Sequence, residues 1–224
     1  MGQVAAILAA AGRGSRFGAA ENKVFTRLAG RSLLYWALRA LERSPSIDDV
    51  VVATGAEDCE RVSAAVAEGG FTRVRAVCAG GAERYDTVCR ALERLPAGAR
   101  WVAVHDAARP LARPALIEAV VAAARESGAA VPATPVVDTL KRSADGRVID
   151  GTAERAGLYQ VQTPQVFRRD LLVRALALTD DDVTDEAALI ERLGVSVATF
   201  EGDERAFKVT TPLDFALART LLSS

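Results

Sequence analysis

The sequence predicts an α/β fold in which a mostly parallel, Rossmann-like sheet carries helices on both faces. Two observations predict it. Short apolar runs rich in β-branched residues alternate along the chain with longer segments of helical periodicity. Half of the 224 residues are hydrophobic, which suffices for a substantial core at this length. Because buried strands that alternate with helices form parallel sheets, we expect a single domain over residues 1–224.

Each predicted strand is a short apolar run, and each predicted helix has its apolar residues at helical spacing. In the first helix, Leu34, Leu38 and Leu41 fall on one face. The expected strands cover residues 4–8, 50–53, 74–78, 101–105, 129–131 (continuing toward 136) and 196–200. The expected helices cover residues 32–43, 58–68, 82–95, 113–125, 169–178, 185–193 and 213–222.

The alternation of strands and helices breaks in the middle of the chain. Segments 137–142 and 147–149 both show period-two patterns, and the Asp145–Gly146 pair between them favours a β-hairpin turn. This hairpin has too few apolar residues to be stable alone. We therefore expect an arm over about 137–157 that packs on a second copy of the chain and forms a homodimer. The alternative, a hairpin lying on its own domain, stays open.

Charge and cysteine content narrow the function classes. With 28 basic and 29 acidic residues the net charge is −1, which gives no basis for non-specific binding to nucleic acid or membrane surfaces. No apolar run reaches the roughly 18 residues of a membrane-spanning helix, and no signal-peptide pattern is expected at the N-terminus. The three cysteines show no CxxC spacing. Reduced thiols in a cytoplasmic protein are therefore expected.

A glycine-rich basic loop follows the first predicted strand. Small side chains at the end of a strand let backbone N–H groups approach an anion closely. Residues 8–18 have this character and include Arg16, while Lys23 beyond them is one of only three lysines among 28 basic residues. A triphosphate is the expected ligand. The glycine spacing also fits an NAD(P)-dependent short-chain oxidoreductase, but the acid expected after the second strand and a Tyr-x-x-x-Lys pair are both missing.

Three further motifs lie next to predicted strand ends or helix starts. Asp106 ends an apolar strand and is followed by two alanines and Arg109. This carboxylate could hold Mg²⁺, a ribose hydroxyl or a cation, although an acid there can also simply cap a loop. A Gly-Gly pair precedes Thr87, whose hydroxyl could recognise a base edge. Lys208 comes shortly before a proline-initiated helix.

An acidic cluster at residues 180–186 invites interpretation as a metal site. We interpret it instead as a solvated loop that caps the following helix, with Thr184 as the N-cap.

Taken together, these motifs resemble the 2-C-methyl-D-erythritol 4-phosphate cytidylyltransferase family of the nucleotide-diphospho-sugar transferase superfamily. The resemblance runs over essentially the whole chain and rests on seven stretches in order. They are residues 10–16, Gly80–Gly81 with Arg84 and Thr87, and residues 105–110, 138–142, 163–165, 184–187 and 208–210. The chain departs from the family pattern at Val24, where glutamine is usual, and at Ala82, where an acid is common.

The resemblance implies a reaction. CMP would pass from CTP to 2-C-methyl-D-erythritol 4-phosphate, giving 4-diphosphocytidyl-2-C-methyl-D-erythritol and pyrophosphate in the non-mevalonate isoprenoid pathway. A phosphate oxygen of the acceptor would attack the α-phosphorus of CTP in line. Mg²⁺ or another divalent cation would bind mainly through the CTP phosphates, with Asp106 as a possible ligand, and no organic cofactor is implied. The nearest alternative is a cytidylyltransferase for ribitol 5-phosphate or another polyol phosphate.

The resemblance also assigns roles to particular residues. The implied catalytic residues are Arg16, Lys23, Arg155 and Lys208. The implied CTP contacts are Ala10, Ala11, Gly12, Gly14, Arg16, Lys23, Gly80, Ala82, Arg84, Thr87, Asp106 and Ala107. The implied contacts with the sugar-alcohol phosphate are Asp106, Arg109, Thr139, Arg155, Thr163 and Lys208. Because the family's arm crosses a dimer, Thr139 and Arg155 would complete the neighbouring subunit's site.

Overall fold

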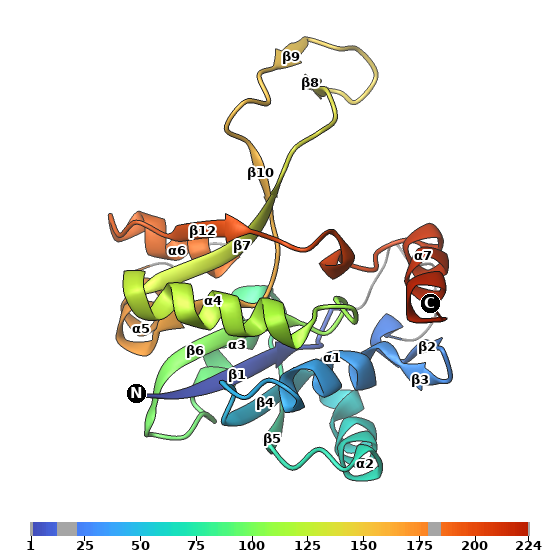
Figure 1. Ribbon diagram of the computed structural model, residues 1–224, viewed down its shortest axis with the longest axis vertical. Coiled ribbons are helices and arrows are strands. Elements are labelled where there is room, and N and C mark those ends of the chain that lie inside the picture. Colours follow the sequence, from blue (N-terminus) through green and yellow to red (C-terminus); the bar gives the residue numbers. More distant parts are fainter. Residues whose placement is uncertain (1, 13–21, 179–184, 224) are drawn as a thin grey trace.

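The computed structural model describes residues 2–12, 22–178 and 185–223. Within them, an eight-stranded sheet forms the middle layer, in the order β10-β7-β11-β6-β1-β4-β5, with β12 paired to β7 (Figure 1). The strands are β1 (Gln3–Ala9), β4 (Asp49–Thr54), β5 (Val74–Ala79), β6 (Ala99–Asp106), β7 (Ala129–Pro135), β10 (Tyr159–Val161), β11 (Gln165–Arg168) and β12 (Ala198–Glu201). Pairing is parallel from β6 through β1 and β4 to β5, as predicted.

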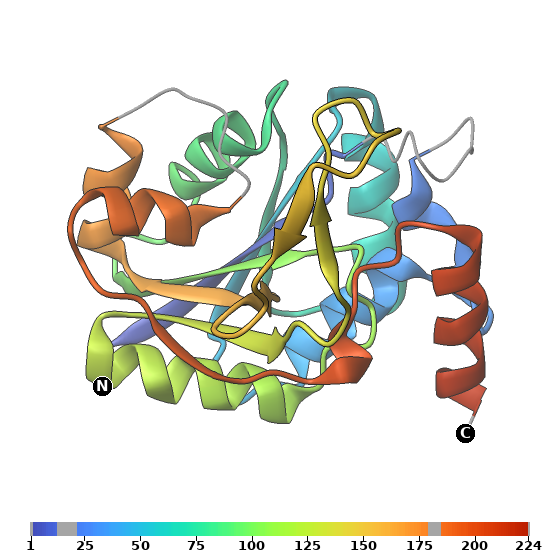
Figure 2. The same cartoon turned by 90° about the horizontal axis from the view of Figure 1, so that it is seen from above.

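Helices cover both faces of this sheet, so the predicted α/β class is confirmed (Figure 2). They are α1 (Leu33–Glu42), α2 (Cys59–Gly69), α3 (Arg84–Leu92), α4 (Pro114–Ser127), α5 (Arg169–Leu176), α6 (Glu186–Arg192) and α7 (Pro212–Ser223). Alternate residues of β1 enter opposite cores: Val4 and Leu8 pack with α1 and α4, whereas Ile7 packs with α3, α5 and α6. The period-two alternation of strand side chains thus builds both layers.

Smaller elements surround the sheet. A short hairpin joins β2 (Arg27–Leu28) to β3 (Arg31–Ser32), and the arm contains β8 (Leu140–Arg142) and β9 (Gly151–Ala153). Among the described residues, single turns of 3-10 helix are η2 (Lys23–Phe25), η3 (Ala56–Asp58) and η4 (Glu204–Ala206). In the described parts of the chain, no helix has both the length and the apolar character needed to cross a bilayer.

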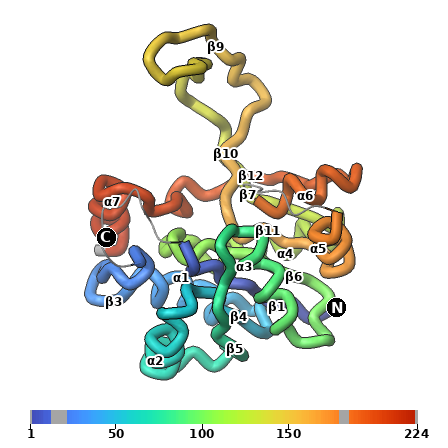
Figure 3. Tube along the Cα trace, turned by 180° about the vertical axis from the view of Figure 1, so that it is seen from behind, coloured from blue at the N-terminus to red at the C-terminus, as the bar shows by residue number. Residues whose placement is uncertain are grey.

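The arm projects away from the body and returns through β10, as Figures 1 and 3 show. The sequence prediction of its second strand at 147–149 is wrong, because Leu140 pairs with Ala153 and Arg142 with Gly151. The Asp145 carboxylate accepts the backbone N–H groups of Arg147 and Val148, at 2.7 and 2.9 Å. Such local bonds compete with strand pairing and hold this stretch as a loop.

Two antiparallel strands of the large sheet were not predicted. β11 lies between β6 and β7 and is antiparallel to both, so β6 and β7 are not neighbours. β10 pairs with residues 133–135 at the far end of β7. Each is only three or four residues long, too short for a periodic pattern to stand out. The predicted N-cap of α6 is also wrong: Asp185, not Thr184, accepts the Ala188 N–H at 3.1 Å.

Candidate active site

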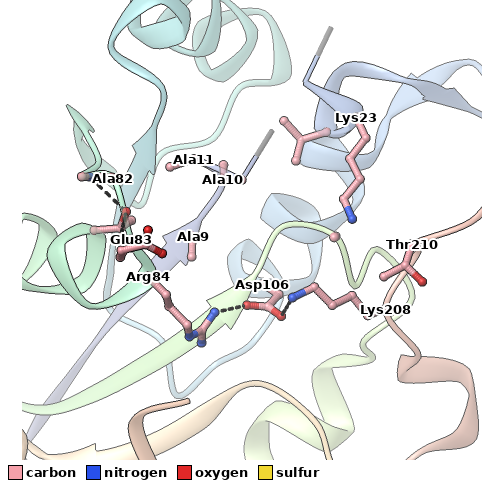
Figure 4. A pocket seen from close by; sticks show the side chains of 15 residues that line it. Ala9, Ala10, Ala11, Lys23, Ala82, Glu83, Arg84, Asp106, Lys208 and Thr210 are labelled. Carbon is pink, nitrogen blue, oxygen red and sulfur yellow. Dashed lines mark hydrogen bonds and ion pairs between the residues drawn. The ribbon is translucent and has the colours of Figure 1, made fainter. Parts of the chain in front are cut away.

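A cavity of about 330 Å³ opens at the carboxyl ends of β1 and β6 (Figure 4). Open α/β sheets bind their ligands at this edge. The end of β1, η2, the start of α3 and the segment before α7 form its walls. Its lining residues are Ala9, Ala10, Ala11, Gly12, Lys23, Val24, Gly81, Ala82, Glu83, Arg84, Thr87, Asp106, Ala108, Lys208 and Thr210.

Asp106 is the electrostatic centre of this cavity. Arg84 Nη1 lies 2.6 Å from its Oδ1 and Lys208 Nζ 2.9 Å from its Oδ2, approaching from opposite sides (Figure 4). Arg109 Nε is 3.9 Å from Oδ2. Burial by itself would raise the pKa of Asp106, but the charges of Arg84 and Lys208 hold it well below its ordinary range. The carboxylate is therefore ionised at neutral pH and holds three cations near one point.

Arg84 is bound by a second carboxylate on its other side. Its Nε and Nη2 donate to the two carboxylate oxygens of Glu186, at 3.0 and 2.8 Å. Glu186 is only 1% exposed, at the first position of α6. The interpretation of residues 180–186 as a solvated loop is therefore wrong for Glu186. The geometry is the bidentate fork that suits a planar guanidinium.

Lys23 enters the cavity from η2 and is held by its surroundings. Its Nζ donates to the Val209 carbonyl oxygen at 2.8 Å. Asn22 caps the η2 turn by accepting the Val24 N–H, and its amide donates to the Ala10 carbonyl at 2.8 Å. Asn22 therefore ties the lysine's turn to the end of β1, where the proposed phosphate-binding loop begins.

The segment that leads into α3 packs tightly against Ala11, in the loop that follows β1. Thr87 Oγ1 accepts the Gly81 N–H and donates to the Glu83 carbonyl, both at 3.0 Å. A Cβ on Gly80 would lie 2.8 Å from Ala11 Cβ, and one on Gly81 would lie 2.0 Å from Asp86 Cβ. Both positions therefore require glycine. The Thr87 hydroxyl keeps one lone pair beyond these two bonds.

Behind Asp106, a buried pair fixes the backbone. Thr163 Oγ1 accepts the Asp106 N–H at 3.1 Å and lies 2.9 Å from His105 Nδ1. Burial lowers the pKa of His105 to about 4, so its ring is neutral at pH 7. Thr163 is 3% exposed and holds the strand end from behind. Its contact with the acceptor stays a prediction.

Comparison with known proteins identifies the family of the chain that forms this site. The model of the 2-C-methyl-D-erythritol 4-phosphate cytidylyltransferase family matches residues 4–224. The chain belongs to this family. It is therefore a nucleotidyltransferase by family, and the alternative of an NAD(P)-dependent short-chain oxidoreductase is wrong.

Individual members of the family are similar over most of their lengths. The chain is 47% identical over 223 residues to the 2-C-methyl-D-erythritol 4-phosphate cytidylyltransferase of Frankia casuarinae, covering 99% of this chain and 82% of that one. It is 46% identical to the enzyme of the same name from Nocardia farcinica, covering 99% and 94%. The crystal structure from Thermus thermophilus is 35% identical, with a TM-score of 0.79 and full coverage of both chains.

The structure brings most of the residues implied by the family resemblance together. Nine of them line the one cavity: Ala10, Ala11, Gly12, Lys23, Ala82, Arg84, Thr87, Asp106 and Lys208. Gly80 and Ala107 adjoin it through Ala11 and Ala9. Arg109 donates to the Ala206 carbonyl at 2.7 Å, beside the Asp106 cluster. Gly14 and Arg16 lie outside the described residues.

The arm residues lie apart from this cavity in the single chain. Thr139 directly precedes β8, and Arg155 follows β9 and donates to the Val137 carbonyl. Neither lines the cavity described above. Their assignment to a site stays a prediction that requires a second copy of the chain.

Glu186 is the site residue that sequence reasoning missed. One signal could have found it: Leu189 and Ile190 follow at the i+3 and i+4 positions and are fully buried, so Glu186 shares the buried face of its helix. An acid on such a face needs a cationic partner. Arg84 is 102 residues away in sequence, and nothing local indicates the pairing.

The carboxylates of this site do not fit a resident metal ion. In the described residues, no three His, Cys, Asp or Glu side chains are grouped to hold one. Both oxygens of Asp106 already face Arg84 and Lys208. The charged side chains of the site therefore suit an anionic ligand rather than a metal cation.

Proposed function

We propose that this chain transfers CMP from CTP to 2-C-methyl-D-erythritol 4-phosphate and releases pyrophosphate, as a step of the non-mevalonate isoprenoid pathway. The observation that carries the proposal is the Asp106 cluster, which gathers Arg84 and Lys208 in the same cavity as Lys23, with Arg109 beside it. A cavity with this surplus of cations suits a nucleoside triphosphate and a phosphorylated acceptor. Membership of the family supports the identity of both substrates.

The proposed reaction is a single displacement at phosphorus. A phosphate oxygen of the acceptor forms a bond to the α-phosphorus of CTP. The bond from that phosphorus to the oxygen bridging to the β-phosphate breaks, and pyrophosphate leaves with the electron pair. Such a reaction depends on positioning and on stabilising negative charge, so it needs fixed cations more than a covalent intermediate.

The cations have distinct proposed tasks. Lys23, with Arg16 earlier in the sequence, stabilises the triphosphate and the charge that develops on the α-phosphoryl oxygens. Lys208, held 2.9 Å from Asp106, faces the acceptor phosphate. The small side chains of Ala10 and Ala82, with the hydroxyl of Thr87, border the space proposed for cytosine and ribose.

We propose that the divalent cation, Mg²⁺ in the cell, enters with CTP. Because Asp106 is engaged by cations on both oxygens, the ion would be held by the triphosphate oxygens instead. Its contribution would be to neutralise phosphate charge. Chelation by EDTA should abolish turnover and added Mg²⁺ should restore it, with the free energy of unfolding unchanged because in this proposal the ion enters with CTP.

We also propose that the arm forms a homodimer. It exposes apolar side chains with nothing to cover them in one chain: Val137, Val148 and Ile149 are 72%, 63% and 63% exposed. A second copy would cover them and bring Thr139 and Arg155 to its own site. The three free cysteines support a reducing, cytoplasmic location for this dimer.

The test is pyrophosphate release by the purified chain with CTP and Mg²⁺. We expect release with 2-C-methyl-D-erythritol 4-phosphate and release at least about a hundredfold slower with ribitol 5-phosphate, whose backbone differs in length and branching. Asp106→Asn, which removes the carboxylate that orders three cations, should lower the rate about 10²–10³-fold. Release with ribitol 5-phosphate alone would assign the chain to another polyol phosphate, and release with neither would refute the proposed reaction.

A further inference from the structure

Glu186 is a buried carboxylate that faces the site without lining it. Both of its oxygens are occupied by one side chain, since Oε1 accepts from Arg84 Nε at 3.0 Å and Oε2 from Arg84 Nη2 at 2.8 Å. The third donor used by Arg84, Nη1, goes to Asp106 at 2.6 Å. Arg84 therefore connects two carboxylates, one inside the cavity and one behind it.

The fold fixes Glu186 in place through β11. Gln165 is 1% exposed and donates from Nε2 to the Asp185 carboxylate at 2.9 Å. Its Oε1 accepts the Ala187 N–H at 3.2 Å, so the two residues that flank Glu186 are both tied to one side chain. Gln165 in turn pairs with Val104, two residues before Asp106 on β6. The strand that carries Asp106 and the helix start that carries Glu186 are thus held in a fixed relation.

We propose that Glu186 is a positioning residue for the transfer reaction: it fixes the guanidinium plane of Arg84, and through it the orientation of the Asp106 carboxylate. The inference rests on the proposed function. A bidentate pair leaves a planar guanidinium no rotation about its own axis. Arg84 Nη1 then donates to Oδ1 of Asp106 from one fixed direction, and Oδ2 of Asp106 remains directed at Lys208.

Charge balance gives Glu186 a second effect on the same cluster. Arg84, Arg109 and Lys208 surround Asp106, so these four residues alone would carry two net positive charges. Glu186 reduces this to one. The anionic substrates then meet a cluster whose cations are partly neutralised and geometrically fixed, instead of three mutually repelling cations around one acid.

The first experiment compares Glu186→Gln with the wild type and with Glu191→Gln. Glutamine keeps the shape but offers one acceptor, and its NH₂ group opposes an N–H of Arg84. Glu191 is an exposed acid on the same helix and serves as the matched control. We expect Glu186→Gln to lower kcat/KM for the acceptor about ten- to hundredfold, because a small misplacement of a charged group has effects of this size. Glu191→Gln should stay within about twofold.

A double-mutant cycle separates positioning from a loss of general structure. If Glu186 acts through Asp106, then Glu186→Gln in an Asp106→Asn background should lower kcat/KM for the acceptor less than about twofold. This coupling is expected even though the two side chains do not touch. Equal fold losses in both backgrounds would overturn the proposal. So would a Glu186→Gln enzyme with the kinetics of the Glu191→Gln control.

A second variant covers the case in which Glu186→Gln does not fold. Glu186→Asp keeps the charge but withdraws the carboxylate by one methylene, so it cannot reach both nitrogens of Arg84. We expect a loss of about tenfold or more in kcat/KM with a melting temperature near that of the wild type. Wild-type kinetics in this variant would overturn the proposal. Failure of the proposed function is distinguishable, because the wild-type chain would then release no pyrophosphate.

Discussion

At the scale of the residue, His105 shows how burial decides what a side chain can do. It is the only histidine in the chain. Its ring is fully buried behind the site, beside the Thr163 hydroxyl. Because burial lowers its pKa to about 4, it remains neutral next to the ionised Asp106. Its neutral ring is therefore held as a hydrogen-bonding group beside Thr163, behind the cavity.

This burial predicts a pH dependence of stability. In the unfolded chain His105 binds a proton near its ordinary pKa of about 6.5, whereas the folded chain resists protonation down to about pH 4. The unfolded state therefore binds more protons in this window, and the free energy of unfolding falls as the pH drops through it, by up to about 3 kcal/mol from this residue.

Urea unfolding between pH 4 and pH 7 measures this effect. His105→Asn should have a shallower dependence of the unfolding free energy on pH than the wild type across the window. The NMR signal of the single histidine provides an independent readout. A ring that titrates near pH 6.5 in the folded protein would contradict the assignment of a neutral, buried side chain.

At the scale of the element, the start of α3 depends on two glycines that close it against the β1 loop. Gly81→Ala would place a Cβ within 2.0 Å of Asp86 Cβ, so the turn has to open. Thr87 and Arg84 would move with it. We expect a rise in KM for CTP of about tenfold or more and a loss of about 1–3 kcal/mol in unfolding free energy.

The matched control for this change is Gly151→Ala in the arm. An added Cβ there meets no atom within 4 Å, and its backbone is extended. Steady-state kinetics with varied CTP and urea unfolding should both leave Gly151→Ala near the wild type. Equal effects of the two substitutions would show that the tight contact at Gly81 does not position the nucleotide.

The elements also show how far sequence could predict this protein. The strands β1, β4, β5, β6, β7 and β12 and the seven α-helices of the described residues were predicted within a few residues, because their apolar periodicity is local. β2, β3, β10, β11 and the second strand of the arm were missed, since their runs are short. β10 and β11 also pair with strands that are distant in sequence. In the site, the predicted residues beside strand ends line one cavity, whereas Glu186 was not predicted because it is connected to the cavity only through Arg84, which the fold brings to it.

At the scale of the whole molecule, the proposed dimer predicts complementation between inactive chains. Arg155→Ala removes an arm residue proposed to reach the partner's site, and Lys23→Ala removes a cation of the chain's own site. Each homodimer should be inactive. After mixing and exchange, half of the dimers carry one intact site out of two, so about a quarter of the wild-type activity should return.

Pyrophosphate release before and after subunit exchange measures this recovery, with each variant alone as the baseline. Val148→Asp combined with Ile149→Asp should yield monomers by sedimentation, since both side chains are more than half exposed on the arm. No recovery in a mixture shown to contain heterodimers would mean that Arg155 serves its own chain.

The position of β11 has a consequence for the order in which the chain can assemble during synthesis. β6 and β7 follow one another along the chain, yet the space between them in the sheet belongs to residues 165–168, which emerge from the ribosome only after the entire arm. Until then, the edge of β6 from Trp101 to Val104 has no strand to pair with on that side. A nascent chain paused at the arm would thus expose this unpaired apolar strand edge, which is prone to aggregation. A chaperone that binds the chain would give the greatest protection at this stage.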